Sequence, residues 1–161
     1  MLPFNKTFND LILEYVPTMP LTTDQYYSEL SDYLGQFGMH LGENKFNPDI
    51  DYVNRLQKGI YKGKDQIGKI ELKINKNTLF LEHIKSYGKY YRQNFGLVSK
   101  IYPFHHQMAL LHNLVVKTNA VNDITYNKFL ETFKDFQIKK TGGKITATPK
   151  QNEIQNSSVG V

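Results

Sequence analysis

Residues 69–84 read KIELKINKNTLFLEHI and fit two secondary structures. From Ile70 to Ile74 apolar residues alternate with charged ones, the pattern of a half-buried strand. Asn75-Lys76-Asn77 supplies turn residues, and Thr78–Ile84 resumes with residues common in strands. A small β-hairpin near residues 69–85 is therefore the interpretation that we adopt.

A helix over residues 78–91 is the competing interpretation of the second half. Leu79, His83, Tyr87 and Tyr90 also recur with a period close to 3.6 residues. The sequence alone leaves this alternative open.

Four amphipathic helices are predicted around this hairpin. Thr22 and Gln25 have the spacing of a capping box, which starts the first helix. Asp49 or Asp51 starts the second, of about ten residues, and Pro103 starts the third. Asn122 or Asp123 starts the last, which ends near Lys139 and Lys140. Their apolar faces are Tyr26, Leu30, Tyr33, Leu34 and Phe37; Ile50, Val53, Leu56 and Ile60; Phe104, Met108, Leu111 and Val115; and Tyr126, Phe129, Leu130, Phe133 and Phe136.

These patterns predict a mainly α (α+β) fold with about four helices and one small hairpin. The proline-containing residues 1–21 are expected to form an extended N-terminal arm, and 22–140 a single globular domain. Residues 141–161 are polar and are expected to form a C-terminal tail that does not order alone.

Composition excludes several classes of site. The sequence of 161 residues contains no cysteine, so disulfides, thiol nucleophiles, thiolate zinc sites and iron–sulfur clusters are excluded. No apolar run of about 18 residues is present, so no membrane span is predicted. The first fifteen residues lack a basic segment followed by an apolar one, so no secretory signal is expected. The expected location is the cytoplasm or a virion.

Charge is unevenly distributed along the chain. Residues 1–54 hold two lysines against eight acidic residues, whereas residues 55–100 hold eleven basic residues against three acidic ones. The basic block predicts a surface for a polyanion or a partner chain, although such runs are often plain solvated surface. The candidate binding residues are Lys58, Lys62, Lys64, Lys69, Lys85, Lys89, Tyr90, Tyr91, Arg92 and Lys100. Tyrosines between cations in residues 87–95 could stack single-stranded bases, form a protein interface or pack in the core.

Four histidines are candidates for metal ligands or bases. His105, His106 and His112 lie on one predicted helix, at spacings of one, six and seven residues. Helical histidines share an ion at spacings of three or four, and no carboxylate occurs between Glu82 and Asp123. We interpret them, together with His83, as helix-end and interface residues, so no metal is predicted.

No enzyme motif is complete. Gly63-Lys64 and Gly143-Lys144 lack the hydroxyl residue that follows in a phosphate-binding loop. No serine lies in a Gly-x-Ser-x-Gly turn. Capping explains Asp49 and Asp51, and Glu29 and Asp32 lie on the polar side of the first helix. The sequence therefore predicts no catalytic residue and no cofactor.

The leading functional hypothesis is a non-catalytic structural or adaptor component of a large assembly, such as a phage virion protein from an AT-rich genome. Its expected partners are other protein chains, copies of itself included. The alternative is an accessory protein that binds nucleic acid non-specifically through residues 55–100.

Overall fold

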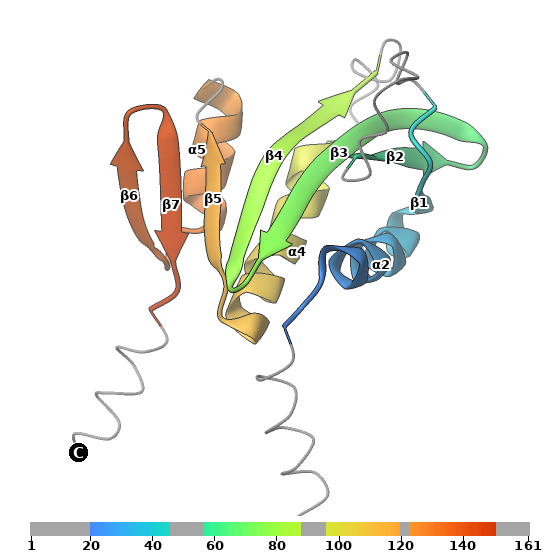
Figure 1. Cartoon of the computed structure of the whole chain (residues 1–161). Coiled ribbons are helices and arrows are strands. Elements are labelled where there is room, and N and C mark those ends of the chain that lie inside the picture. Colours follow the sequence, from blue (N-terminus) through green and yellow to red (C-terminus); the bar gives the residue numbers. More distant parts are fainter. Residues whose placement is uncertain (1–19, 46–56, 88–95, 120–122, 151–161) are drawn as a thin grey trace, which may run out of the picture.

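The computed structural model describes residues 20–45, 57–87, 96–119 and 123–150. Within these ranges the chain forms a seven-stranded mixed sheet and three α-helices (Figure 1). The helices are α2 (Thr23–Leu34), α4 (Leu97–His112) and α5 (Asp123–Thr132), and a short 3-10 helix, η1 (Gly35–Phe37), follows α2. The strands are β1 (Met39–Gly42), β2 (Gln57–Lys62), β3 (Asp65–Asn75), β4 (Thr78–Ser86), β5 (Val115–Asn119), β6 (Gln137–Thr141) and β7 (Lys144–Thr148).

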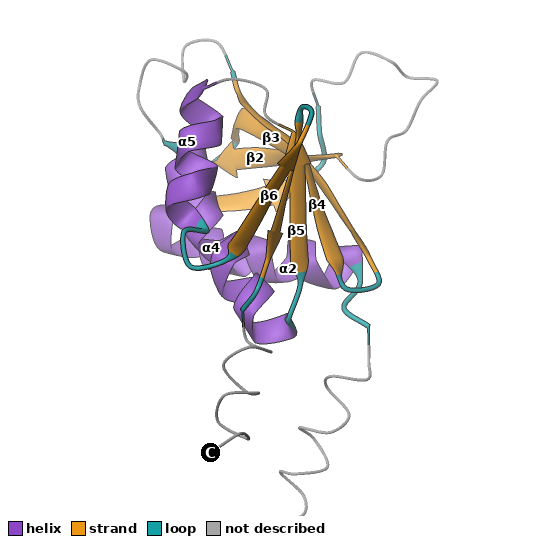
Figure 2. Ribbon diagram, turned by 90° about the vertical axis from the view of Figure 1, so that its left-hand side faces the viewer, coloured by secondary structure: helices purple, strands orange, loops and turns teal. Residues whose placement is uncertain are grey.

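The strand order is β1-β2-β3-β4-β5-β7-β6. Neighbouring strands are antiparallel, except that β4 and β5 run parallel and are joined through α4. In Figure 2, α4 and α5 lie on one side of the sheet. α2 packs beside α4, since the Tyr26 ring contacts Phe104 and His105. We call this side of the sheet the helical face and the opposite side the open face.

The core lies between the helical face and the helices. The strands contribute the inward residues Ile70, Leu72, Leu79, Val116 and Ile145, each at most 1% exposed. Tyr26 and Leu30 of α2, Ile101 of α4 and Phe129 of α5 cover them. No described helix combines the length and apolar character needed to cross a bilayer.

The prediction of a mainly helical fold is wrong. The hairpin near residues 69–85 is present as β3 and β4, but it is the centre of a seven-stranded sheet. The glycine- and lysine-rich stretch before it forms β2, the turn at Gly63 and the start of β3. Few of its residues are apolar, so local patterns do not identify it as strand. Pairing of β2 with β1 and with β3 nevertheless satisfies its backbone groups.

The predicted helices are corrected in detail. The first is confirmed with its capping box: Gln25 N donates to Thr22 Oγ1 at 3.1 Å, and Thr22 N donates to Gln25 Oε1 at 3.0 Å. The last residues of the predicted second helix belong to β2, and the rest of that predicted helix lies outside the described residues. α4 begins at Leu97, with Pro103 inside it, and ends at His112; the left-handed φ of 54° at the next residue, Asn113, allows the turn into β5.

The C-terminal part also differs from the expected tail. α5 ends at Thr132, and Gln137–Thr141 forms β6 in place of a helix end. β7 follows and buries Ile145 and Ala147 in the sheet. The N-terminal arm before residue 20 and the tail after residue 150 lie outside the described residues.

Candidate functional site at the ends of β4 and β5

The parallel strands β4 and β5 separate at their carboxyl ends. They pair from Thr78 with Val115 to Leu81 with Thr118, and β4 then continues to Ser86 without β5. The β3–β4 register shifts at this point, because Leu72 pairs with Leu81 whereas Glu71 pairs with His83. Glu82 is therefore the extra residue of a β-bulge, which bends and twists a strand. The bulge explains why β4 diverges from β5.

A cavity of about 110 Å³ occupies the gap between the diverging strands. We call it the slot. Ile70, Leu81, Ile84 and Val98 form its apolar wall, and Thr118 of β5 forms part of the opposite side. Its polar groups include Glu71, His83, Tyr102 and His105. Ligands of open α/β sheets bind outside the carboxyl ends of parallel strands, which is the position of this slot.

Glu71 and His83 form a cross-strand pair on the open face beside the slot. Glu71 Oε1 lies 3.8 Å from His83 Nδ1 and accepts a hydrogen bond of 2.9 Å from Gln57 Nε2. Partial burial lowers the pKa of His83 below its usual 6.5, and the charge of Glu71 opposes this effect. His83 is thus a neutral base near pH 7, next to a carboxylate that Gln57 orients.

His105 lies at the buried end of the slot. It is 0% exposed, and its Nδ1 lies 2.6 Å from the Tyr26 hydroxyl. Burial lowers the pKa of His105 to about 3 and raises that of Tyr26 well above 10, so both groups are neutral at pH 7. A neutral phenol donates readily to Nδ1, which places the imidazole proton on Nε2. Within the described ranges Nε2 has no hydrogen-bond partner.

Tyr102 supplies a third neutral group. It lies on α4, one turn before His106, and lines the slot. Burial raises the pKa of the Tyr102 phenol to about 12. The hydroxyl therefore keeps its proton at neutral pH and can donate a hydrogen bond to a negatively charged group in the slot.

The amino end of α4 also lies at the slot. Val98, in the first turn, lines it. The first turn contains no acidic residue, and no described side chain caps Gly96 at the start of the helix. The partial positive charge of this helix end favours a negative group nearby. Across the described part of the chain, no three histidine or acidic side chains gather as a metal site.

The predicted binding residues lie in several places. Lys69 and Lys85 pair across β3 and β4 on the open face, whereas Lys58 reaches the Tyr27 ring on the helical face, at 5.8 Å. Lys62 ends β2, Lys64 lies in the β2–β3 turn and Lys100 lies on α4. Lys89, Tyr90, Tyr91 and Arg92 lie outside the described residues. For all of these candidate residues, a role in binding a polyanion or a partner stays a prediction.

Sequence reasoning misses the residues that form the slot. Local patterns identify Glu71 only as an alternating strand position, and His83 and His105 as helix-end or interface residues. Tyr26 and His105 are 79 residues apart, so no local pattern connects them. His106 is also interpreted from the sequence as a helix-end or interface residue. In the structure its Nε2 lies at hydrogen-bond distance, 2.8 Å, from Asp135 Oδ1. Asp135 lies outside the stretch between Glu82 and Asp123, which contains no carboxylate.

Comparisons with known proteins give structural similarity alone. No family model matches the chain, and no curated protein matches it. One similar solved structure is the PaiA N-acetyltransferase of Thermoplasma acidophilum in complex with coenzyme A. It is 18% identical, with a TM-score of 0.41 over 58% of this chain and 59% of that one. Another is a Desulfovibrio desulfuricans protein described as a GNAT-family acetyltransferase, 13% identical, with a TM-score of 0.36 over 56% of this chain and 64% of the other.

The chain thus spans less than two thirds of each of these structures, and TM-scores below 0.5 do not establish a shared fold. Both proteins are described as acetyltransferases. This finding corrects the prediction of a non-catalytic structural protein from a phage virion.

Proposed function

We propose that the chain is an acyltransferase that holds an acyl thioester in the slot and transfers the acyl group to an amine. The observation that carries the proposal is the separation of β4 from β5 at Glu82, which opens a narrow cavity beside a base and a neutral phenol.

The shape of the slot favours a thin, linear ligand. A cavity of about 110 Å³ lies below the usual size of a ligand pocket, about 300–1,000 Å³, so it takes a thin segment of a ligand, such as part of an extended chain. Beyond Leu81, no described strand pairs with the β5 side of β4. Backbone groups on a free strand edge need partners, and a linear ligand with amide groups can provide them as an added strand does. The pantetheine arm of coenzyme A is such a chain.

Charge at the slot fits the rest of this ligand. Coenzyme A, which is bound in the PaiA structure, carries phosphate groups beyond its pantetheine arm. The amino end of α4 offers backbone N–H groups and a positive helix dipole beside the slot. The arm and its phosphates therefore have complementary surfaces at one end of the sheet.

The polar groups suit transfer to an amine. His83, paired with Glu71, can take a proton from the attacking amine as its nitrogen bonds to the thioester carbonyl carbon. When the resulting oxyanion collapses, the carbon–sulfur bond breaks and the thiolate leaves. The neutral Tyr102 hydroxyl can donate a hydrogen bond to that thiolate, which takes its proton from solvent. The products are an amide and a free thiol.

Calorimetric titration of the chain with coenzyme A and with acetyl-coenzyme A tests the proposal. We expect both to bind, and Val98→Phe, which fills the slot, to weaken binding at least about tenfold. Ile124→Phe is the matched control, because Ile124 is 71% exposed on α5 and does not line the slot. Thiol release can be followed with a thiol reagent without background, since the chain has no cysteine.

Two results would contradict the proposal. One is the absence of binding by either compound to the folded chain. The other is equal binding by the wild type and by a Val98→Phe variant whose circular dichroism spectrum shows that it is folded.

A further inference from the structure

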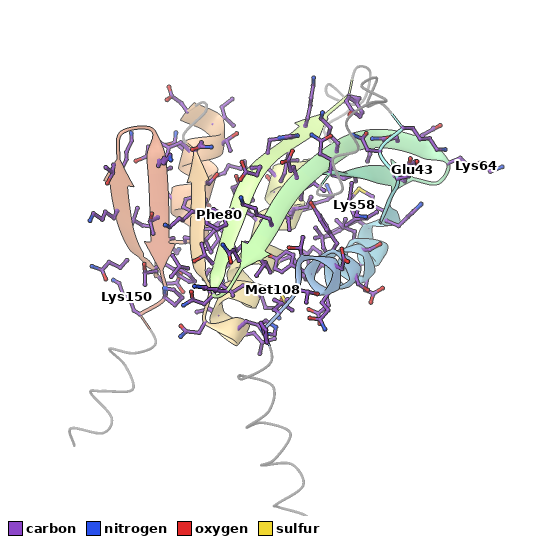
Figure 3. All side chains as sticks on the ribbon, viewed as in Figure 1. Glu43, Lys58, Lys64, Phe80, Met108 and Lys150 are labelled. Carbon is purple, nitrogen blue, oxygen red and sulfur yellow. The ribbon has the colours of Figure 1, made fainter. Side chains whose placement is uncertain are left out.

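A row of side chains crosses the open face next to the slot. Strand register places Phe80 between Lys73 on β3 and Lys117 on β5. The two ammonium groups lie 5.1 and 5.9 Å from the centre of the Phe80 ring. Figure 3 shows Phe80 in the middle of the sheet. This face thus presents an aromatic ring flanked by two cations.

These residues line a second, more open cavity of about 460 Å³, which we call the basin. Lys144 of β7 adds a third lysine to its wall, and Glu82 is the one acidic residue among the described residues that line it. The lysines Lys73, Lys117 and Lys144 are exposed. No ion pair of these three lysines is found within the described part of the chain. The basin therefore has unneutralised positive charge.

The basin continues into the slot. Leu81, Glu82, Thr118 and Asn119 line both cavities. A thioester carbonyl at the mouth of the slot is thus open to attack by a molecule that rests in the basin. The Glu71–His83 pair lies on the same open face of the sheet, on the slot side of this boundary.

We propose that the basin binds the acyl acceptor, and that this acceptor is an amine bearing carboxylates, such as an acidic amino acid or an acidic peptide amino end. The inference rests on the proposed function for the transfer step. Lysines attract carboxylates as point charges, and Phe80 offers apolar surface to the carbon chain. The acceptor amine then faces Glu82 and His83 at the slot. A polycationic amine is repelled by the same lysines.

Acceptor choice is the first test. With acetyl-coenzyme A as donor, kcat/KM is compared for the dipeptide Glu-Glu, for glycinamide and for spermidine. We expect Glu-Glu to be preferred, and Lys73→Met/Lys117→Met to lower its kcat/KM about tenfold while leaving the Kd of coenzyme A unchanged. Lys134→Met is the matched control, because Lys134 is exposed just after α5 and does not line the basin. Preference for spermidine or glycinamide overturns the inference, as does a double variant that behaves like Lys134→Met.

Direct titration with Glu-Glu separates the two proposals. We expect the dipeptide to bind the chain without donor, more weakly as ionic strength rises, and to lose this binding in the double variant. If coenzyme A does not bind but Glu-Glu binds in this way, the acyltransferase proposal fails and the basin stands. If coenzyme A binds and Glu-Glu shows no salt-dependent binding, the basin proposal fails alone.

Discussion

The Tyr26 hydroxyl and His105 Nδ1 lie 2.6 Å apart, and both side chains are 0% exposed. This hydrogen bond joins α2 to α4 beneath the slot. Rings surround it, since Tyr26 stacks against His105 at 5.7 Å and meets Phe104 edge-on at 5.4 Å. A titratable group is thereby held neutral in an apolar environment.

This pair predicts a loss of stability in mild acid. The pKa of His105 is about 3 in the folded chain because the ring is buried, and about 6.5 when unfolded. Between these values the unfolded chain binds a proton that the folded chain does not. The free energy of unfolding should therefore fall by about 1.4 kcal/mol per pH unit as pH decreases below about 6.5. Urea denaturation at several pH values measures this change in the free energy of unfolding.

A double variant isolates the contribution of His105. Tyr26→Phe/His105→Leu removes both polar partners together, which costs less than leaving one of them unpaired. We expect the free energy of unfolding of this variant to fall less steeply with decreasing pH than that of the wild type, by about 1.4 kcal/mol per pH unit. The single variant Tyr26→Phe should be destabilised by about 1–3 kcal/mol. Equal pH dependence in wild type and double variant would show that His105 is not the responsible group.

Local sequence patterns predict the parts of the fold that depend on neighbouring residues. The Thr22–Gln25 capping box and the turn at Asn75–Asn77 are both present. Each involves residues within three positions of one another, so one short window contains the whole interaction.

The edge of the sheet near the C-terminal end depends on pairing with a segment distant in sequence. β7 reads KITAT and β6 reads QIKKT, and neither has enough apolar residues to identify it as a strand. β7 is stabilised by pairing with β5, where Val116 lies opposite Ala147. Val115 fits the helical period of α4, but Asn113 ends the helix before it. Tertiary pairing here overrides local preference.

The slot follows from a feature without a sequence signal. Its opening depends on the bulge at Glu82, and a bulge has no fixed residue requirement at this position. Its walls come from β3, β4, β5, α4 and α5, which are up to 55 residues apart at Ile70 and Thr125. Glu71 and His83 become a pair only after β3 and β4 adopt this register.

Gly68 is predicted to be essential for packing next to the slot. A Cβ atom at this position would collide with the Lys85 carbonyl oxygen and would lie 2.8 Å from Leu97 Cδ1. Gly68→Ala must therefore push β3 away from β4 or from α4, which should cost about 1–3 kcal/mol of unfolding free energy. Thermal and urea denaturation measure this loss.

Gly35→Ala is the control for this prediction. Gly35 has a right-handed helical φ of −56°, and a Cβ there would meet no atom within 4 Å. We expect this variant to be as stable as the wild type or up to about 1 kcal/mol more stable. If Gly68→Ala behaves in the same way, the close contact of β3 with β4 and α4 is not the constraint that we infer.

The Glu71–His83 pair predicts the pH dependence of acyl transfer. The negative charge of Glu71 raises the pKa of His83, in opposition to burial, which lowers it. Glu71→Gln removes the charge, so the pKa of His83 should fall further. If neutral His83 is the base, the acidic limb of the kcat/KM profile reflects this pKa. The limb should therefore move to lower pH in Glu71→Gln, while His83→Gln should lose activity across the profile.

Gln57→Leu separates the charge of Glu71 from its orientation. This variant removes the 2.9 Å hydrogen bond to Glu71 but keeps the carboxylate. Because the charge remains, the acidic limb should stay nearer to its wild-type position than in Glu71→Gln. An acidic limb that stays in place in Glu71→Gln, with activity retained in His83→Gln, would exclude His83 as the base.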